Sequence, residues 1–288
     1  MEACKSTYGI IGYPLQQTLS PVMHNTAFQA LKVDAEYKVF PLKEEELKGF
    51  FAGLHEKTSP IFGLNVTVPY KEKVIPLLDS LSPYANKILA VNTVVISPQR
   101  QLIGQNTDGP GFLMHLTELG IHPEGKRISI LGAGGAARAI ISVLCLIPER
   151  PQSIRIYDVE KYKVEQLISD FRDRFDVSIL ESVKSLDDLN IEIADLLINT
   201  TPIGMKKEDP CLIDENILHP NMFVYDVIYT PQETKLLKLA KAKGAQVSNG
   251  LGMLFYQGVL AFQHWAQIEL DDRIKKKMRM SLMGALKK

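Results

Sequence analysis

The chain has 288 residues, more than most single domains hold, so its length predicts two domains. Hydrophobic residues make up 45% and charged residues 23% of the sequence, which is typical of globular proteins and excludes a disordered or fibrous chain. Lysine and arginine total 33, as do aspartate and glutamate, so no net charge favours nucleic acid or an acidic membrane as a partner.

The cysteines are few and far apart, form no CxxC pair and have no histidine beside them at metal-ligand spacing. This spacing argues against a disulfide framework and against a structural zinc site, so we expect no metal. The N-terminus lacks the pattern of a signal peptide, and no run of about 18 apolar residues is present. We therefore expect a cytoplasmic monomer or homodimer without a membrane or nucleic-acid partner.

The first hundred residues alternate between strand-like and helix-like segments. A short apolar run at 8–12 predicts a buried strand, and Ser20 with Pro21 predicts the N-cap and first residue of a helix that continues to 31. There follow a strand-like segment at 35–42, a helical one at 44–56, and strand-like runs at 62–68 and 88–97. This alternation predicts a largely parallel sheet covered by helices.

The same alternation restarts near residue 126. A strand, a glycine-rich turn and an apolar helix occupy 126–147, and strand-like segments follow at 153–158, 194–205 and 223–231. These segments predict a second α/β unit. The last apolar segment, 251–268, has helical spacing and is compatible with packing on either domain.

The sequence ILGAGGAARAI places Gly132, Gly134 and Ala137 in a G-x-G-x-x-A pattern between an apolar strand and an apolar helix. Gly132 permits a tight turn, Gly134 lets the backbone approach a pyrophosphate, and Ala137 lets the helix pack closely on the strand. The helix N-terminus supplies free N–H groups to the phosphates. The turn predicts a dinucleotide site, and a turn of the same shape without a ligand is the alternative.

Asp158 closes the next strand, about 21 residues after Ala137, near the position of the acid that binds the adenosine ribose in dinucleotide folds. A carboxylate here accepts hydrogen bonds from free ribose hydroxyls and repels a 2′-phosphate, whereas an arginine favours the phosphate. Val159 and Glu160 follow, with no arginine. We therefore predict NAD as the preferred cofactor, with NADP left open.

Four polar stretches in the first domain, TLSPVMHN, LNVTVPYK, AVNTV and GQNTDGPG, lie at strand ends or helix starts, where α/β proteins bind ligands. Oxidation of a secondary alcohol by a nicotinamide needs a group that takes the hydroxyl proton, and Lys71 held near Asp108 suits that role. On residue types alone, a surface ion pair is the alternative. His24 follows Ser20 by one helical turn, and we expect it to make a local hydrogen bond and not to act as a base.

Together these stretches resemble the shikimate dehydrogenase family over essentially the whole chain. The shared order is GYP…LSPxxHN, NVTVPxK, AVNT, GxNTDGxG, GAGGAARA, NTTPxGM, DVIYxP and GxxMLxxQG. The resemblance implies reversible NAD(P)-dependent hydride transfer between shikimate and 3-dehydroshikimate, as in aromatic amino acid biosynthesis. An NAD-dependent quinate/shikimate dehydrogenase, another dehydrogenase with a similar dinucleotide domain, and a non-catalytic quinate, shikimate or NAD sensor remain alternatives.

The resemblance also implies roles for individual residues. Lys71 resembles the catalytic acid/base, with Asp108 as its partner. Residues that resemble substrate contacts are Thr18 and Ser20 for the carboxylate, Thr67, Asn92 and Asp108 for the ring hydroxyls, and Tyr229 and Gln257. Residues that resemble cofactor contacts are Gly132, Ala133, Gly134, Gly135, Ala136, Asp158, Thr200, Gly250 and Met253.

The chain departs from the family pattern at two places. Thr18 stands where serine is common in the family. Threonine keeps the hydroxyl but adds a methyl group, which narrows the substrate site near the carboxylate. Asp158, Val159 and Glu160 stand where NADP-using members carry an Asn-Arg-Thr cluster. The second departure resembles the NAD-using quinate/shikimate branch.

The resemblance therefore implies an α/β fold in two domains. We predict an N-terminal α/β substrate domain with a mostly parallel sheet over 1–107, completed by C-terminal helices at 253–288. A Rossmann-like dinucleotide-binding domain is predicted over 108–252.

Overall fold

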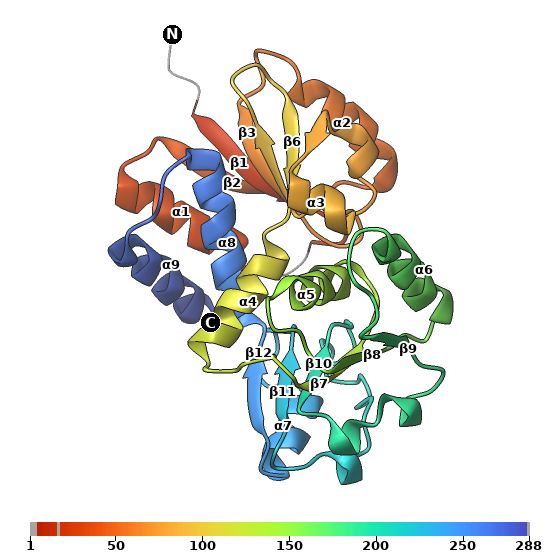
Figure 1. Ribbon diagram of the computed structural model, residues 1–288. Helices are drawn as coiled ribbons and strands as arrows, with labels where there is room; N and C mark the ends of the chain where they lie inside the picture. The colour runs from red at the N-terminus through yellow and green to blue at the C-terminus, as the bar shows by residue number, and fades with distance from the viewer. Residues whose placement is uncertain (1–4, 16–17, 287–288) are drawn as a thin grey trace. The chain divides into compact units, whose positions relative to one another are not determined.

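The computed structural model describes residues 5–15 and 18–286 (Figure 1). The chain divides into two compact units: one extends to Gly111 and resumes at Phe255, and the other is Phe112–Leu254. Both boundaries fall inside helices, namely α4 (Asp108–Glu118) and α8 (Leu251–Ala266). The first unit is therefore discontinuous in sequence, whereas the second is continuous.

The first unit contains a six-stranded sheet in the order β2-β1-β3-β5-β6-β4. Its strands are β1 (Ser6–Ile11), β2 (Ala35–Phe40), β3 (Ile61–Val66), β4 (Ser80–Leu81), β5 (Thr93–Ile96) and β6 (Leu102–Gln105). The strand β1 is parallel to β2 and β3, and β4 is parallel to β6, whereas β5 is antiparallel to both of its neighbours. Of the run 88–97, only β5 is a strand, because residues up to Ile88 belong to a helix that the Ser82 hydroxyl caps.

Helices cover both faces of this sheet. They are α1 (Ser20–Leu31), α2 (Leu47–Leu54), α3 (Pro83–Ile88), the later part of α8, and α9 (Asp272–Ala285), with short 3-10 turns η1 (Glu44–Glu46) and η2 (Ile75–Leu77). Figure 1 shows α1, α8 and α9 on one face and α2 and α3 on the other. Buried side chains such as Phe51, Leu64 and Val94 fill the core between α2, α3 and the sheet.

The tryptophan of α8 fixes that helix on the first sheet. The Trp265 indole N–H donates to the Val94 carbonyl at 3.0 Å. A Cβ atom on Gly63 would lie 2.4 Å from the indole ring, so only glycine fits beneath it. Residues near the end of the chain therefore complete the core that its first hundred residues begin.

The second unit contains a six-stranded, wholly parallel sheet in the order β12-β11-β10-β7-β8-β9. Its strands are β7 (Arg127–Leu131), β8 (Ser153–Tyr157), β9 (Leu180–Ser182), β10 (Leu196–Asn199), β11 (Phe223–Asp226) and β12 (Gln246–Asn249). Counted from β7, this is the doubly wound order of dinucleotide-binding folds. The edge strands β9 and β12 are not among the predicted strands, because their sequences have a weaker apolar pattern.

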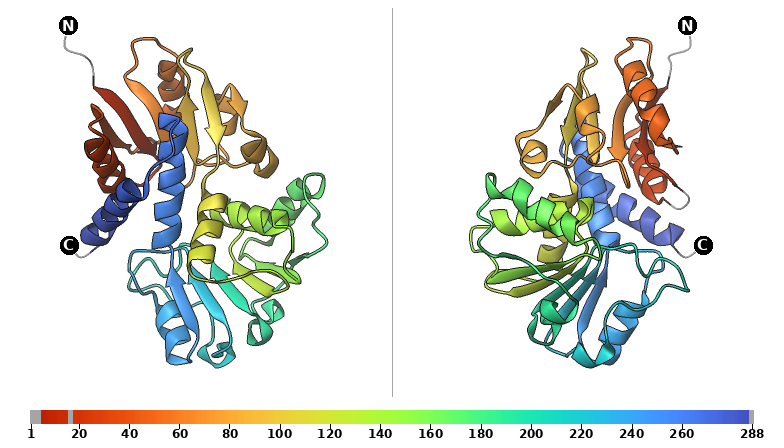
Figure 2. Two further views of the ribbon diagram at one scale, coloured as in Figure 1. Left: turned by 60° about the vertical axis from the view of Figure 1, so that its left-hand side comes forward. Right: turned by 90° about the vertical axis from the view of Figure 1, so that its right-hand side faces the viewer.

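Helices also cover the second sheet on both faces. They are the later part of α4, then α5 (Gly135–Leu146), α6 (Lys161–Arg172) and α7 (Lys235–Ala242), with 3-10 turns η3 (Asp187–Leu189), η4 (Ile191–Ile193) and η5 (Glu215–Ile217). Figures 1 and 2 show α5 and α6 on one face and α7 on the other. None of the helices in the described parts of the chain is long and apolar enough to cross a membrane.

Candidate functional site

Lys71 and Asp108 form an ion pair in the first unit, with 2.6 Å between Lys71 Nζ and Asp108 Oδ2. Lys71 lies in the turn after β3, where its carbonyl accepts the Val91 N–H at 2.7 Å. Asp108 begins α4, and its N–H donates to the Asn106 side-chain oxygen at 3.0 Å. The two charged side chains are 14% and 8% exposed, so a charge-assisted hydrogen bond between them is stronger than on an open surface.

Asn92 and Gln257 are connected to this pair through Thr107, the residue directly before Asp108. Asn92 Nδ2 donates to Thr107 Oγ1 at 2.9 Å and to Gln257 Oε1 at 3.4 Å, and its Oδ1 accepts the Thr107 N–H at 2.8 Å. The backbone of α8 passes so close to α4 that a Cβ atom on Gly111 would lie 2.7 Å from Gln257 N. Thr107 lies within the GQNTDGPG stretch but is not among the predicted site residues; its place directly before Asp108 is the signal.

Thr18 and Ser20 lie together at the start of α1. The Ser20 N–H donates to Thr18 Oγ1 at 3.3 Å, and Ser20 is 3% exposed. The prediction of Ser20 as N-cap is wrong by one residue, because Leu19 occupies that position and Ser20 is already helical.

Thr67 follows β3 and lies beside the end of β1. Its N–H donates to the Ile11 carbonyl at 2.9 Å. A Cβ atom on Gly12 would lie 2.6 Å from the Thr67 methyl group, so glycine is needed there for the two chain segments to approach. The first unit thus holds all of the predicted substrate residues except Tyr229.

The glycine-rich turn joins β7 to α5 in the second unit. Gly132 has φ +99°, and a Cβ atom there would lie 2.6 Å from Thr200 Oγ1, which itself donates to the Leu131 carbonyl at 2.6 Å. Gly134 is the N-cap of α5 and offers no side chain to its first N–H groups. A Cβ atom on Gly134 would meet no described atom within 4 Å, so open space lies in front of the helix N-terminus.

Asp158 connects the loop after β8 to this turn. Its Oδ2 accepts the Ala133 N–H at 2.9 Å, and its Oδ1 accepts the Glu160 N–H at 2.9 Å. Glu160 in turn forms an ion pair with Lys163 in the first turn of α6. The carboxylate that we expect to bind a ribose therefore already accepts a backbone hydrogen bond on each oxygen.

Tyr229, Gly250 and Met253 belong to the second unit. Tyr229 is half-buried, and burial raises the pKa of its phenol. The Gly250 N–H donates to the Ile228 carbonyl at 3.2 Å, and a Cβ atom on Gly250 would lie 2.0 Å from the Val227 carbonyl oxygen. Met253 is buried in the first turn of α8.

Asp226 is a buried carboxylate that the sequence analysis does not single out. Its Oδ1 accepts from Asn199 Nδ2 at 3.0 Å and from the Ile228 N–H at 3.1 Å, and its Oδ2 accepts from the Thr234 hydroxyl at 2.7 Å. Burial raises the pKa of Asp226 to about 6. The cluster joins the NTTPIGM and DVIYTP stretches at the ends of β10 and β11, and polar residues at the ends of two buried strands are its signal.

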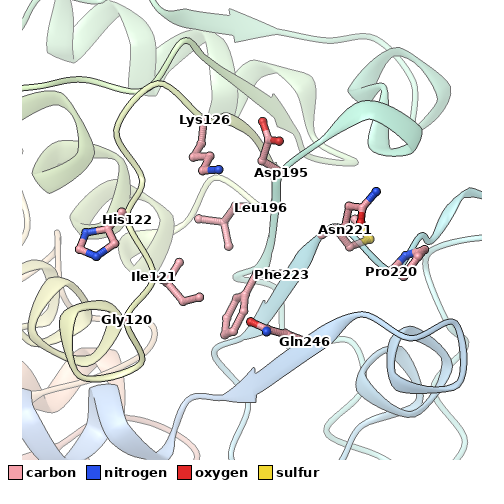
Figure 3. A pocket seen from close by; sticks show the side chains of 11 residues that line it. Gly120, Ile121, His122, Lys126, Asp195, Leu196, Pro220, Asn221, Phe223 and Gln246 are labelled. Atoms are coloured by element: carbon pink, nitrogen blue, oxygen red, sulfur yellow. The ribbon is translucent and has the colours of Figure 1, made fainter.

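A pocket of about 400 Å³ opens at the opposite edge of the second sheet (Figure 3). Its floor includes Leu196 and Phe223, which begin β10 and β11, and Gln246, which begins β12. The glycine turn follows the carboxyl end of β7, and the strands are parallel. The pocket is therefore distinct from the predicted dinucleotide site.

Residues 10–94 match the family model described as the shikimate dehydrogenase substrate binding domain. A shikimate dehydrogenase (NADP(+)) of Carboxydothermus hydrogenoformans is 42% identical over 274 residues, which cover 93% of this chain and 94% of the relative. The similarity therefore extends over both units and is not confined to the dinucleotide fold.

Our prediction that NAD is the preferred cofactor is wrong, because curated relatives at about this identity are named for NADP(+). A crystal structure of a shikimate dehydrogenase in complex with NADP+ has a TM-score of 0.87 and 34% identity to this chain, covering 99% of it and 96% of the other. The prediction treats Asp158 as a free ribose acceptor. In the structure both of its oxygens already accept backbone hydrogen bonds, so the residue type alone does not set the preference.

The fold agrees with the sequence match. The crystal structure of shikimate dehydrogenase from Aquifex aeolicus has a TM-score of 0.85 and 38% identity to this chain, covering 96% of it and 98% of the other. The solved relative therefore shares the overall fold of this chain, which includes both α/β units, the Rossmann-like strand order and the glycine turn. This chain belongs to the shikimate dehydrogenase family.

Proposed function

We propose that this protein is a shikimate dehydrogenase that interconverts shikimate and 3-dehydroshikimate with NADP. The observation that carries the proposal is the ion pair of Lys71 and Asp108 beside the Asn92 and Gln257 side chains. Binding alone does not require a proton-transfer pair, so this arrangement favours an enzyme over a sensor. The curated relatives are named as shikimate dehydrogenases, which supports shikimate as the substrate.

The Lys71 amine is the proposed acid/base. It takes the proton of the reacting hydroxyl during oxidation and returns a proton to the carbonyl oxygen during reduction. Asp108 orients the amine, and the 2.6 Å contact holds its nitrogen in one place. Because both side chains are largely shielded from water, the proton passes between Lys71 and the substrate oxygen instead of bulk solvent.

The substrate contacts divide by chemistry. The hydroxyls of Thr18 and Ser20 are proposed to donate to the substrate carboxylate, for which short hydroxyl donors at a helix start are suited. Amide, hydroxyl and carboxylate groups bind ring hydroxyls, because each ring hydroxyl both donates and accepts. For that role we propose Thr67, Asn92, Asp108 and Gln257, with Tyr229 from the second unit.

The second unit fits a dinucleotide at the glycine turn. The open space before Gly134 and the N-terminus of α5 suit a pyrophosphate, which Gly132, Ala133, Gly134, Gly135 and Ala136 would hold. Thr200, Gly250 and Met253 are proposed to lie along the rest of the dinucleotide, and Asp158 to brace the turn. When bound, NADP supplies the nicotinamide ring that exchanges hydride with the substrate.

A cation near the ribose is needed for a 2′-phosphate. Lys163, at the start of α6, is the proposed contact; its ammonium lies at the loop after β8, where it pairs with Glu160 and would have to exchange that partner for the phosphate. Lys163 would then take the role of the arginine that NADP-using members carry where this chain has residues 158–160.

The experiment is a comparison of kcat/KM for shikimate and quinate, each with NADP and NAD. We expect turnover with shikimate, and a higher kcat/KM with NADP than with NAD. Absence of turnover with either acid would refute the enzyme and favour a sensor. A preference for quinate or for NAD would refute the substrate or the cofactor assignment separately.

A further inference from the structure

Two residues of α1 hold the ring and backbone of Tyr37 in β2. The His24 imidazole stacks on the Tyr37 ring, with centroids 4.5 Å apart and planes at 16°. The Asn25 side chain donates to the Tyr37 carbonyl at 3.2 Å and accepts the Tyr37 N–H at 2.8 Å. Burial raises the pKa of the Tyr37 phenol. Tyr37, only 4% exposed, is therefore held at its backbone and ring face.

His24 serves as a neutral stacking surface in this arrangement. Its ring is fully buried, and neither nitrogen has a hydrogen-bond partner of good geometry among the described residues. Burial lowers the pKa of His24 to about 3, although nearby Asn65 opposes part of the change. The expectation of a local hydrogen bond at His24 is wrong, because aromatic packing against Tyr37 and Trp265 replaces it.

The Tyr37 phenol begins a buried chain of hydrogen bonds that crosses the sheet. It donates to Asn65 Oδ1 on β3 at 2.7 Å. Asn65 Nδ2 donates to the Asn92 carbonyl and to Thr93 Oγ1, each at 3.2 Å. Thr93 Oγ1 donates to Asn92 Oδ1 at 3.1 Å, and Asn92 contacts Gln257. Tyr37, Asn65, Asn92 and Thr93 are all at most 4% exposed.

We propose that Tyr37 is a positioning residue for substrate binding, because its phenol holds Asn65, and Asn65 in turn bonds the Asn92 carbonyl and the Thr93 hydroxyl beside it. The inference rests on the proposed function, in which Asn92 with Gln257 binds ring hydroxyls. Loss of the phenol leaves Asn65 Oδ1 buried without its donor. The Asn92 and Gln257 side chains then lose a fixed position, while Lys71 and Asp108 are unchanged.

This role accounts for two polar residues of the SPVMHN stretch that its helix start does not need. His24 covers the Tyr37 ring, and Asn25 fixes its backbone. These residues lie within two turns of one helix, so a single rigid element holds a side chain from the neighbouring strand. A precisely held hydroxyl binds a ligand without further loss of side-chain freedom.

The test is Tyr37→Phe, which keeps the ring and removes only the hydroxyl. We expect KM for shikimate to rise about tenfold, with kcat and KM for NADP within about twofold of the wild type. Tyr8→Phe is the matched control, since Tyr8 packs on the same Trp265 ring, with centroids 5.3 Å apart, but lies outside the chain of hydrogen bonds. Thr93→Val, which removes the hydroxyl between Asn65 Nδ2 and the Asn92 side-chain oxygen, should also raise KM for shikimate and serves as the test if Tyr37→Phe folds poorly.

A double-variant cycle separates positioning from general destabilisation. If Tyr37 acts through Asn92, Asn92→Ala combined with Tyr37→Phe should raise KM for shikimate little more than Asn92→Ala alone. Multiplicative effects in the double variant, an unchanged KM in Tyr37→Phe, or an equal rise in Tyr8→Phe would overturn the proposal. A wild-type protein without shikimate turnover would refute the proposed function itself, so the two failures are distinct.

Discussion

Lys71 Nζ lies 2.6 Å from Asp108 Oδ2 in a largely shielded pair, whereas Lys73, two residues further on, pairs with Glu44 at the surface. We predict that Lys71→Ala lowers kcat by a factor of about 10² to 10⁴, the usual contribution of a general acid or base, with a modest change in KM for shikimate. Lys73→Ala is the control and should keep wild-type kcat. Steady-state kinetics test both variants, and wild-type kcat in Lys71→Ala would exclude the acid/base role.

The two glycines of the dinucleotide turn should respond differently to alanine. Gly132→Ala places a Cβ atom 2.6 Å from Thr200 Oγ1 at a φ of +99°, so we predict a loss of stability of about 1 to 3 kcal/mol. Gly134→Ala meets open space, so the unfolding free energy should stay near the wild-type value while KM for NADP rises several-fold. Urea unfolding and cofactor titration measure the two effects. Equal destabilisation by both changes would argue against this division of roles.

Release of Lys163 from Glu160 should strengthen NADP binding. Glu160→Gln removes the carboxylate that pairs with the Lys163 ammonium and that repels a 2′-phosphate. We predict that KM for NADP falls by about threefold and that KM for NAD changes little. Glu165→Gln, which removes the exposed partner of Lys161 on the same helix, is the control. An equal effect of Glu160→Gln on both cofactors would show that Lys163 does not discriminate between them.

The fold was largely predictable because its signals are local, and the site only in part. The glycine turn with its flanking strand and helix, and the motifs around Lys71 and Asp108, are continuous in sequence. The roles of Tyr37 and Asp226 depend on partners that the fold brings together, such as Asn65 and Thr234, and no spacing indicates them. The NAD prediction failed for the same reason, since the N–H that Asp158 accepts belongs to Ala133 in another loop.

Asp226 should make stability depend on pH. Its pKa is about 6 in the folded protein against an ordinary value of 3.8, so the unfolded chain releases this proton at lower pH than the folded protein does. The contribution of Asp226 to stability is therefore fully present below about pH 4, is lost as pH rises to about 6, and is constant above that. The difference amounts to at most about 3 kcal/mol.

Asp226→Asn removes this titration and keeps an oxygen that accepts from Asn199 and Ile228, while its NH2 group can donate to the Thr234 hydroxyl. We predict that the variant gains stability relative to the wild type as pH increases from 4 to 6.5. Urea unfolding of both proteins across this range measures the difference between their unfolding free energies. The contributions of the other carboxylates cancel in this difference. A constant difference across the range would mean that Asp226 titrates as an ordinary aspartate.

The discontinuity of the first unit has a consequence for synthesis on the ribosome. Residues 112–254 form a unit that is complete once they have been made, whereas Trp265, which packs on Gly63 and bonds Val94, arrives only afterwards. Gln257 arrives equally late. The part of the protein translated first therefore waits for residues translated last to complete its core, whereas residues 112–254 need no later segment to complete their unit.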